Sequence, residues 1–251
     1  MLNKVDFYFF SPTGGTRKAG RILADALAEQ VNPIDLCNHE PVQEGSCPAA
    51  VIAMPVFAGR LPAVAVEKVK TLKGSGKTVV TMVVYGVRAY EDALLELNDA
   101  AQEAGFQVAG SAAVVAQHSI VPTVGAGRPD LQDEAEIKAF AAQVLEKLSA
   151  GAAPVQAPGN RPYRDGMNLP ASPVSLDNCI SCGACERVCP VCAVKVEPSG
   201  VVTDVQTCIL CMACTAVCPV KARVLPAPLQ QSMNEKLSAL VDVRRENQFF
   251  L

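Results

Sequence analysis

The sequence predicts an α/β protein in which a doubly wound, five-stranded parallel sheet is followed by a small cysteine-rich α+β domain and a C-terminal helix. Two observations carry this prediction. Residues 1–150 alternate strand-like and helix-like stretches, a pattern typical of parallel strands joined by crossover helices. In contrast, nine of the 11 cysteines lie between residues 179 and 218. The two regions therefore differ in architecture.

Short apolar and β-branched runs predict the strands of the sheet. Four have the character of buried strands, and a fifth, "VNPIDL", is expected to be a short edge strand. The five runs cover residues 4–10, 31–36, 49–55, 77–86 and 110–118. Helices are expected where apolar residues recur with helical spacing, as in "TRKAGRILADALAEQ". These stretches cover residues 16–30, 62–72, 90–105 and 133–150.

A proline-rich segment separates the two regions. Residues 151–178 contain five prolines and three glycines, which favour an extended, semi-rigid chain. The last segment is predicted to be helical from about Leu229, with Leu237, Leu240 and Val241 on one face. We therefore predict four parts: a first domain at 1–150, a linker at 151–174, a cysteine-rich domain at 175–225 and a helical tail at 226–251.

Composition excludes several classes of partner. Half of the residues are hydrophobic and 19% are charged, as in ordinary globular proteins. No apolar run reaches the roughly 18 residues of a membrane span. A net charge of −3 gives no electrostatic reason to expect nucleic acid. The start, "MLNKVDFYFFSPTGG", has no small-residue cleavage site, so we expect it to form a buried strand and not a signal peptide. We therefore expect a cytoplasmic protein.

The cysteines form two copies of C-x2-C-x2-C-x3-C-P, spaced 29 residues apart. In this pattern three thiolates bind one [4Fe–4S] cluster, and the cysteine before the proline binds the other cluster. The two runs therefore predict two clusters with crossed ligands. The first would be held by Cys179, Cys182, Cys185 and Cys218, and the second by Cys208, Cys211, Cys214 and Cys189.

Zinc is the alternative metal, but zinc sites usually use more widely spaced pairs or include histidine. The chain has only His39 and His118, both far from the cysteines in sequence. The clusters are expected to form the core of a segment too small to fold around side chains alone. They could serve only to brace the domain, although two at this spacing are more typical of electron transfer. The fifth cysteine of the first run, Cys192, aligns with Lys221 and is expected to be a small apolar filler.

A glycine-rich loop, "SPTGGT", lies between the first strand and the first helix of the first domain. Backbone N–H groups at a helix N-terminus, together with hydroxyl groups, can bind a phosphate. The loop lacks the lysine of a P-loop and the spacing G-x-G-x-x-G, which argues against ATP, GTP and NAD. A second stretch, "KGSGKT" (73–78), precedes a strand and is expected to be a turn. The predicted phosphate-binding residues are Ser11, Thr13, Gly14, Gly15 and Thr16.

"SPTGGT" resembles the S/T-x-T-G-x-T loop with which flavodoxins hold the phosphate of FMN. In that fold the flavin lies outside the carboxyl ends of the strands, near the first and third. The resemblance implies a second flavin loop at Pro55, Val56, Phe57, Ala58 and Gly59, and a third at Tyr85, Gly86, Val87, Arg88 and Tyr90. Phe57 could cover the flavin ring and the two tyrosines could stack on it or line its edge, or all three could be ordinary packing. Val87 stands where the family has a polar residue.

The cysteine-rich region resembles bacterial two-cluster ferredoxins, and the whole chain resembles the flavodoxin–ferredoxin fusion proteins of anaerobic bacteria. "AYEDALLEL", "GRPD" (127–130) and "PGNRPY" (158–163) share in the second resemblance. It implies low-potential electron transfer between FMN and two [4Fe–4S] clusters, with redox proteins as donor and acceptor. We assign no catalytic residue: His118 is expected to be structural or a contact at the flavin rim, and Arg128 to cap the sheet or brace the linker. Cys37 and Cys47 are expected to be isolated and inert.

Three functions are compatible with these features. The leading one is an electron carrier. The alternative is a self-contained oxidoreductase that reduces a quinone, a metal ion or a small organic acceptor. A third is an assembly or sensing subunit that docks to its partner through a helix at residues 229–251. Alternatively, this helix covers the first domain and has no docking role. The oligomeric state stays open.

Overall fold

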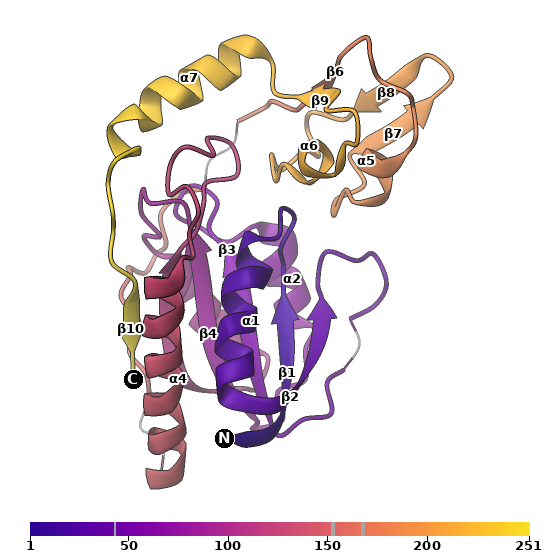
Figure 1. Ribbon diagram of the computed structural model, residues 1–251. Coiled ribbons are helices and arrows are strands. Elements are labelled where there is room, and N and C mark those ends of the chain that lie inside the picture. The colour runs from indigo at the N-terminus through magenta and orange to yellow at the C-terminus, as the bar shows by residue number, and fades with distance from the viewer. Residues whose placement is uncertain (43, 152–153, 167–168) are drawn as a thin grey trace.

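The computed structural model describes residues 1–42, 44–151, 154–166 and 169–251. A three-layer α/β domain forms the larger part, and a smaller domain of short helices and hairpins lies at one end of it (Figure 1). Part of the predicted linker, residues 152–153 and 167–168, falls outside the described residues.

The central sheet contains six strands in the order β10-β5-β4-β3-β1-β2. The five parallel strands run 2-1-3-4-5, which is the flavodoxin-like order, so the predicted fold class is confirmed. The sixth strand, β10, is antiparallel and was not predicted. The strands are β1 (Leu2–Phe9), β2 (Ala28–Asp35), β3 (Ala49–Pro55), β4 (Thr78–Tyr85), β5 (Gln107–Val115) and β10 (Gln248–Phe250).

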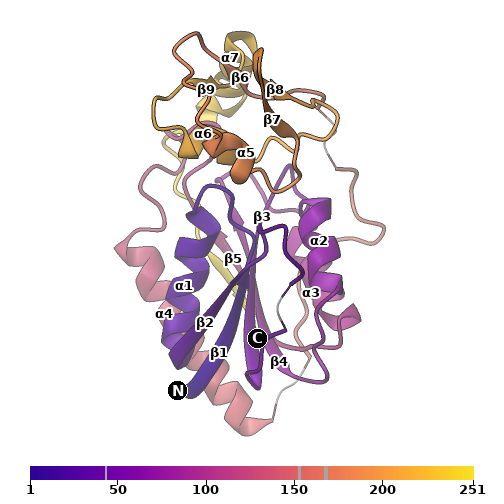
Figure 2. The same ribbon diagram turned by 90° about the vertical axis from the view of Figure 1, so that its right-hand side faces the viewer.

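Two helices cover each face of the sheet (Figure 2). On one face lie α1 (Gly15–Leu27) and α4 (Leu131–Ala150), and on the other lie α2 (Ala63–Lys70) and α3 (Ala93–Glu103). Each face has its own apolar core. Helix α1 packs close to the sheet at Gly20, where an added Cβ would lie 2.6 Å from the ring of Phe7. The alternation of apolar residues therefore predicted each helix and strand of this domain up to residue 150. The predicted helix over 16–30 is wrong at its end, however, because α1 stops at Leu27 and residues 28–30 already belong to β2.

The small domain is built from two similar halves. It contains α5 (Ala184–Arg187), α6 (Ala213–Val217), the hairpin of β7 (Val194–Glu197) and β8 (Gly200–Thr203), and the pair β6 (Val174–Ser175) and β9 (Arg223–Val224). Left-handed backbone recurs at positions 29 residues apart: Ser181 and Leu210 (φ 49° and 51°), Gly183 and Met212 (72° and 63°), Cys192 and Lys221 (both 54°). The sequence repeat is thus a repeat of backbone conformation.

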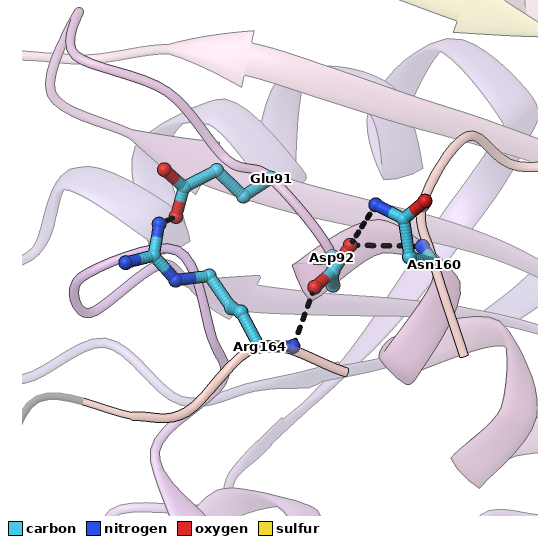
Figure 3. A pocket seen from close by; sticks show the side chains of 5 residues that line it. Glu91, Asp92, Asn160 and Arg164 are labelled. Carbon is cyan, nitrogen blue, oxygen red and sulfur yellow. Dashed lines mark hydrogen bonds and ion pairs between the residues drawn. The ribbon is translucent and has the colours of Figure 1, made fainter. Parts of the chain in front are cut away.

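The linker is bound to α3 and to the loop before it. The Asp92 carboxylate accepts hydrogen bonds from the backbone N–H groups of Asn160 (2.9 Å) and Arg164 (2.7 Å), and Arg164 pairs with Glu91 (Figure 3). About two turns further along α3, Asp99 accepts from Arg161 Nε at 2.9 Å. Residues 160–164 therefore form a strap of polar contacts across this part of the first domain.

The tail is only partly helical. It begins with α7 (Ala227–Leu237) and a single turn, η1 (Ser238–Leu240), and then runs extended into β10. The predicted helix to residue 251 is therefore wrong beyond Leu240. The last residues instead pair with β5, whose backbone would otherwise form an open edge, and Phe249 stacks on Phe140 of α4 at 4.9 Å between ring centroids.

Asn247 fixes the start of this last strand. Its side-chain oxygen accepts the N–H of Val115 (2.9 Å), and its amide nitrogen donates to Asp133 (2.8 Å). Of the three residues predicted to share the apolar face of the tail, Leu237 is buried, Leu240 packs against the core, and Val241 is exposed.

The small domain lies over the carboxyl ends of the parallel strands, and α5 and α6 are on the side that faces this edge (Figures 1 and 2). Cys192 Sγ of the small domain lies 3.5 Å from Nδ1 of His39 in the first domain. Helix α7 of the tail also contacts the first domain, because Gln230 Nε2 donates to Ile120 O at 3.0 Å. In the described part of the chain, no helix is both long and apolar enough to cross a membrane.

Candidate functional site

The predicted phosphate loop forms an open helix N-terminus. Gly14 precedes α1 in left-handed conformation (φ 91°) and has no side chain that could cap the helix. An added Cβ at Gly14 would meet nothing within 4 Å, so the space in front of this turn is free. Ser11 Oγ accepts the N–H of Arg17 in the first turn at 2.9 Å and so closes the loop back on the helix. A helix N-terminus with a glycine at its entrance and free space in front of it fits a phosphate group.

The hydroxyl groups of this loop differ in their surroundings. Thr13 is exposed, Ser11 is half-buried and Thr16 is buried. Gly15 is half-buried at the first turn of α1. The loop therefore presents backbone N–H groups and the Thr13 hydroxyl toward solvent, while direct phosphate binding by each of the five predicted residues stays a prediction.

The predicted second flavin loop is a tight turn after β3. Phe57 and Arg60 exchange backbone hydrogen bonds of 2.8 and 3.2 Å, and Ala58 and Gly59 are left-handed (φ 53° and 87°). Phe57 is half-buried. Gly59 leaves room for Glu91 of the neighbouring loop, because a Cβ added at position 59 would clash with the carboxylate of Glu91. The remaining members of the predicted loop, Pro55 and Val56, continue β3 into this turn.

The predicted third loop is more closed. Tyr85 and Tyr90 are both buried and contact each other edge to face, with ring centroids 5.4 Å apart. The Tyr90 hydroxyl also bonds to Gln248 of β10. Val87 is fully buried at φ 66°, a rare conformation for a β-branched residue, whereas Arg88 is exposed and pairs with Glu91. Stacking of the tyrosines on a flavin stays a prediction.

His118 lies against the third loop and has a defined tautomer. Its Nδ1 accepts the backbone N–H groups of Ile120 (3.2 Å) and Val121 (3.1 Å), so the ring proton of the neutral form is on Nε2. Burial lowers the pKa of His118 and thereby favours that neutral form. Its ring also occupies the space where a side chain at Gly86 would stand. The geometry is that of a fixed hydrogen-bond donor.

Four of the predicted cluster ligands line a single cavity in the small domain. They are Cys189, Cys208, Cys211 and Cys214. Cys189 comes from the first cysteine run and the others come from the second, as the crossed pattern requires. The apolar side chains of Val191, Val194 and Ile209 complete much of the wall. The cavity therefore has the donor set for a [4Fe–4S] cluster, and ligation by these residues stays a prediction.

The other four predicted ligands are connected through their neighbours. Asn178 Nδ2 donates to Val220 O (3.0 Å), and Leu176 N donates to Ala222 O (2.9 Å). These bonds join the chain before Cys179 to the loop after Cys218. Cys185 and Cys218 are buried, Cys179 is half-buried and Cys182 is exposed. The first site is thus nearer to the surface than the second.

Backbone N–H groups point at the two cysteines that precede proline. Ala193 N donates to Cys189 Sγ and Ala222 N to Cys218 Sγ, each at 3.2 Å. Burial raises the pKa of Cys218, but hydrogen bonds from backbone N–H groups of residues 220–223 outweigh it, so its pKa is lowered. Such N–H groups stabilise thiolates and fit iron–sulfur ligation. Among the described residues, no three Cys, His, Asp or Glu side chains converge on a single metal ion.

Cys192 does not have the predicted role of an apolar filler. It is exposed, and its Sγ lies 3.5 Å from Nδ1 of His39, which belongs to the loop after β2. The position faces outward in both halves, because Lys221 has the same backbone conformation and is exposed too. The lysine at the repeat position was the signal in the sequence for an outward-facing residue.

Replacing Cys192 and Cys189 separately tests the ligand assignment. Cys192→Ser is expected to keep the wild-type iron content, since its thiol faces the first domain. Cys189→Ser is expected to lose about half of the iron, because one of two clusters loses a ligand. Iron and acid-labile sulfide are measured after anaerobic reconstitution of the full chain. Iron loss in Cys192→Ser with retention in Cys189→Ser would reverse the assignment.

Cys37, which is isolated in sequence and expected to be inert, contacts the phosphate loop. Its Sγ accepts the N–H of Ser11, the first residue of the phosphate loop, at 3.2 Å. Burial raises the pKa of Cys37 to about 12, and Asp35 and Cys211 add to the rise. Ile209 packs against the core of the first domain. Because Ile209 also lines the second cysteine site, that site adjoins the same core against which Cys37 packs.

Arg128 lies outside this site. It is buried, pairs with Asp133 (Nε to Oδ2, 2.9 Å) and donates to Arg245 O (2.6 Å). It thus braces the tail, not the linker.

The chain matches the family model of a 4Fe-4S dicluster domain over residues 175–224. A search of curated proteins found no match. Among solved structures, a flavodoxin from the domain Archaea is 14% identical, with 58% of this chain and 99% of that chain covered and a TM-score of 0.43. A Streptococcus pneumoniae TIGR4 flavodoxin is 19% identical (57% and 99% covered, TM-score 0.41).

The rubredoxin oxygen:oxidoreductase from Desulfovibrio gigas is 18% identical, with 59% of this chain but 37% of that chain covered and a TM-score of 0.44. The assignment of the first domain to the flavodoxin-like fold follows from its strand order, and the assignment of the second domain follows from the family match and the eight-cysteine pattern.

Proposed function

We propose that this chain, a flavodoxin-like domain joined to a 4Fe-4S dicluster domain, transfers electrons between an FMN and two [4Fe–4S] clusters. The observation that carries the proposal is the contact between the two predicted cofactor sites. Cys37 accepts a hydrogen bond from Ser11 of the phosphate loop, and Cys37 and Ile209 both pack against the same core of the first domain. Ile209 also lines the cavity of the second cysteine site. Two cofactor sites that adjoin in this way suit direct electron exchange within one molecule.

The flavin supplies the ability to take up two electrons one at a time, whereas each cluster carries one. The residues of the chain bind and orient these groups. The N-terminus of α1 would hold the phosphate of FMN, and the loops after β3 and β4 would enclose its ring, with His118 Nε2–H as a donor at Gly86. N–H groups directed at Cys189 and Cys218 would stabilise the clusters.

The positions of the two cysteine sites favour an order for the relay. The site of Cys208, Cys211, Cys214 and Cys189 adjoins the first domain, so its cluster would be the inner one. The other site is nearer to the surface: Cys182 is exposed, and the adjacent Ile180 is 61% exposed. Its cluster would be the outer one, which exchanges electrons with a redox partner protein.

The small domain lies over the carboxyl ends of the strands, where a flavin-dependent enzyme would need an open pocket for a substrate (Figure 2). This arrangement favours a carrier over a self-contained oxidoreductase. A cytoplasmic location in an anaerobe, with unidentified donor and acceptor, belongs to the same proposal.

Phosphorus NMR of the anaerobically reconstituted chain tests both parts of the proposal. Bound FMN is expected to give one shifted ³¹P resonance, which relaxes faster in cluster-loaded protein that has been chemically reduced, because a reduced [4Fe–4S] cluster is paramagnetic. Cys208→Ala, which removes an inner ligand, is expected to abolish most of this enhancement. Cys182→Ala, the matched outer variant, is expected to keep it.

The outcomes separate the two parts. Protein that binds both clusters but no FMN would refute the electron-transfer function as stated. Bound FMN with equal relaxation in the two cysteine variants would leave the flavin in place and refute the inner and outer assignment. Iron content of each variant, expected to be about half of wild type, controls for loss of both clusters.

A further inference from the structure

Arg223 is a buried cation within the small domain. It begins β9 and is 3% exposed. Its guanidinium donates to the hydroxyls of Ser175 (3.0 Å) and Thr203 (2.7 Å), and one terminal nitrogen lies 3.9 Å from Cys214 Sγ. Its Nε is buried and has no hydrogen-bond partner in the described part of the chain. The side chain thus brings a full charge into the domain with only uncharged oxygen partners.

An arrangement of this kind is costly unless an anion is nearby. An arginine keeps its charge at any ordinary pH, and burying a charge without a counterion opposes folding. The two hydroxyls satisfy part of the guanidinium but supply no negative charge. The anion must therefore come from the cysteine sites that surround it.

Arg223 reaches both cysteine sites. One guanidinium nitrogen lies 3.9 Å from Sγ of Cys214, a ligand of the inner site. Cys214 in turn packs in one cluster with Cys185, a ligand of the outer site. Thr203, which accepts the shortest of these hydrogen bonds, also lines the cavity of the inner site.

The internal repeat shows that the fold itself does not require an arginine here. The position 29 residues earlier is Val194, which is 2% exposed and packs with Cys185, Cys189 and Cys214. An apolar side chain therefore fills the equivalent place in the first half. The charge at 223 breaks the symmetry of the two halves in an otherwise matched backbone.

We propose that Arg223 is a tuning residue that raises the reduction potentials of the clusters, the inner one more than the outer. Reduction adds one electron, and so one negative charge, to a cluster whose thiolate ligands already make it anionic. A fixed positive charge nearby stabilises the reduced form more than the oxidised form. The inner cluster experiences the larger effect because the guanidinium contacts its ligand Cys214 directly.

Anaerobic redox titration followed by EPR tests this inference on the reconstituted full chain. Arg223→Met, which is neutral and of similar length, is expected to shift the midpoint potentials of both clusters to more negative values, with the larger shift for the inner cluster. Arg223→Lys keeps the charge and is expected to stay close to wild type. Cys182→Ala and Cys208→Ala identify which signal belongs to which cluster.

Arg187→Gln is the matched control. It also removes one positive charge beside the clusters, but Arg187 is exposed, and its guanidinium donates to the carbonyl of Cys182 at 3.2 Å. Solvent and salt screen such a charge, so the potentials should not move. The effect of Arg223 acts on the clusters alone, so the shifts in midpoint potential should be the same whether or not FMN is bound.

Two results would overturn the proposal. One is unchanged potentials in Arg223→Met with full iron content, and the other is an equal drop in Arg223→Lys. If Arg223→Met does not load, iron content decides: loading by the lysine variant alone supports the need for a charge, and equal failure of both variants contradicts it.

Discussion

Removing the iron is expected to unfold residues 175–225 while the flavodoxin-like domain stays folded. The apolar core of the small domain consists of five buried residues, and three of them are the predicted ligands Cys185, Cys189 and Cys214. A core of this size cannot offset the conformational entropy of about 50 residues, so the free energy of cluster binding must supply the difference. The first domain has two large apolar cores of its own.

Amide hydrogen exchange before and after anaerobic chelation measures this effect. The β7–β8 hairpin and helices α5 and α6 should lose their protection, whereas the amides of β1, β3 and β4 should keep theirs. The internal comparison between the two domains serves as the control. Persistent protection of the hairpin in iron-free protein would show that side-chain packing alone holds the small domain together.

Replacing Asp133 by alanine is expected to cost about 3–5 kcal/mol of unfolding free energy, the range for leaving a buried charge without its partner. Asp133 is 0% exposed. Its carboxylate accepts from Arg128 Nε (2.9 Å), Asn247 Nδ2 (2.8 Å) and the N–H of Asp130 (2.8 Å). Asp133→Ala therefore leaves the Arg128 guanidinium buried and also releases the tail.

The stabilisation by these contacts of Asp133 depends on pH. Burial raises the pKa of Asp133, but its hydrogen bonds to Arg128, Asp130 and Asn247 outweigh that and leave the pKa below its usual value. Because the folded pKa is depressed, the stabilisation is fully present above the ordinary aspartate pKa of about 3.9 and is lost as the pH falls through the folded pKa. The difference between wild type and Asp133→Ala should therefore be constant near neutral pH and shrink in acid.

Urea unfolding of the first domain, followed by tyrosine fluorescence in iron-free protein, gives both quantities. Asp25→Ala is the control: it breaks the Arg21–Asp25 pair, whose side chains are about half exposed, and should cost about 0–1 kcal/mol. Equal losses for the two variants would mean that the buried pair contributes no more than a surface pair.

Local patterns predicted most of this molecule. The helical and strand periodicities of residues 1–150 need only neighbours in sequence, and the cysteine spacing reflects the geometry of a metal cluster. The pairing of Cys189 with the second cysteine run could be predicted for the same reason, since the proline that follows it repeats at Pro219.

Contacts between distant segments were not predictable in this way. The strand β10 has three residues, too few to show a period of two, and it is stable only because β5 offers an open edge. The bond from Ser11 to Cys37 joins two loops that the parallel sheet brings side by side at its carboxyl edge. Arg223 was overlooked because an arginine is usually exposed, and only the comparison with Val194 at the repeat position marks it as unusual.

After the small domain, the chain returns to the sheet of the first domain as β10, and this changes how the two domains are arranged along the chain. Because β10 is the sixth strand of the sheet, the small domain is an insertion within the first domain instead of an appendage to it. Cutting the chain in the linker would keep the five parallel strands of the flavodoxin-like fold but would leave the β5 edge open to pair with other molecules. Excising residues 169–243 and joining the remaining ends would keep all six strands of the sheet. The domain boundaries drawn from the sequence and the boundaries of the sheet thus differ.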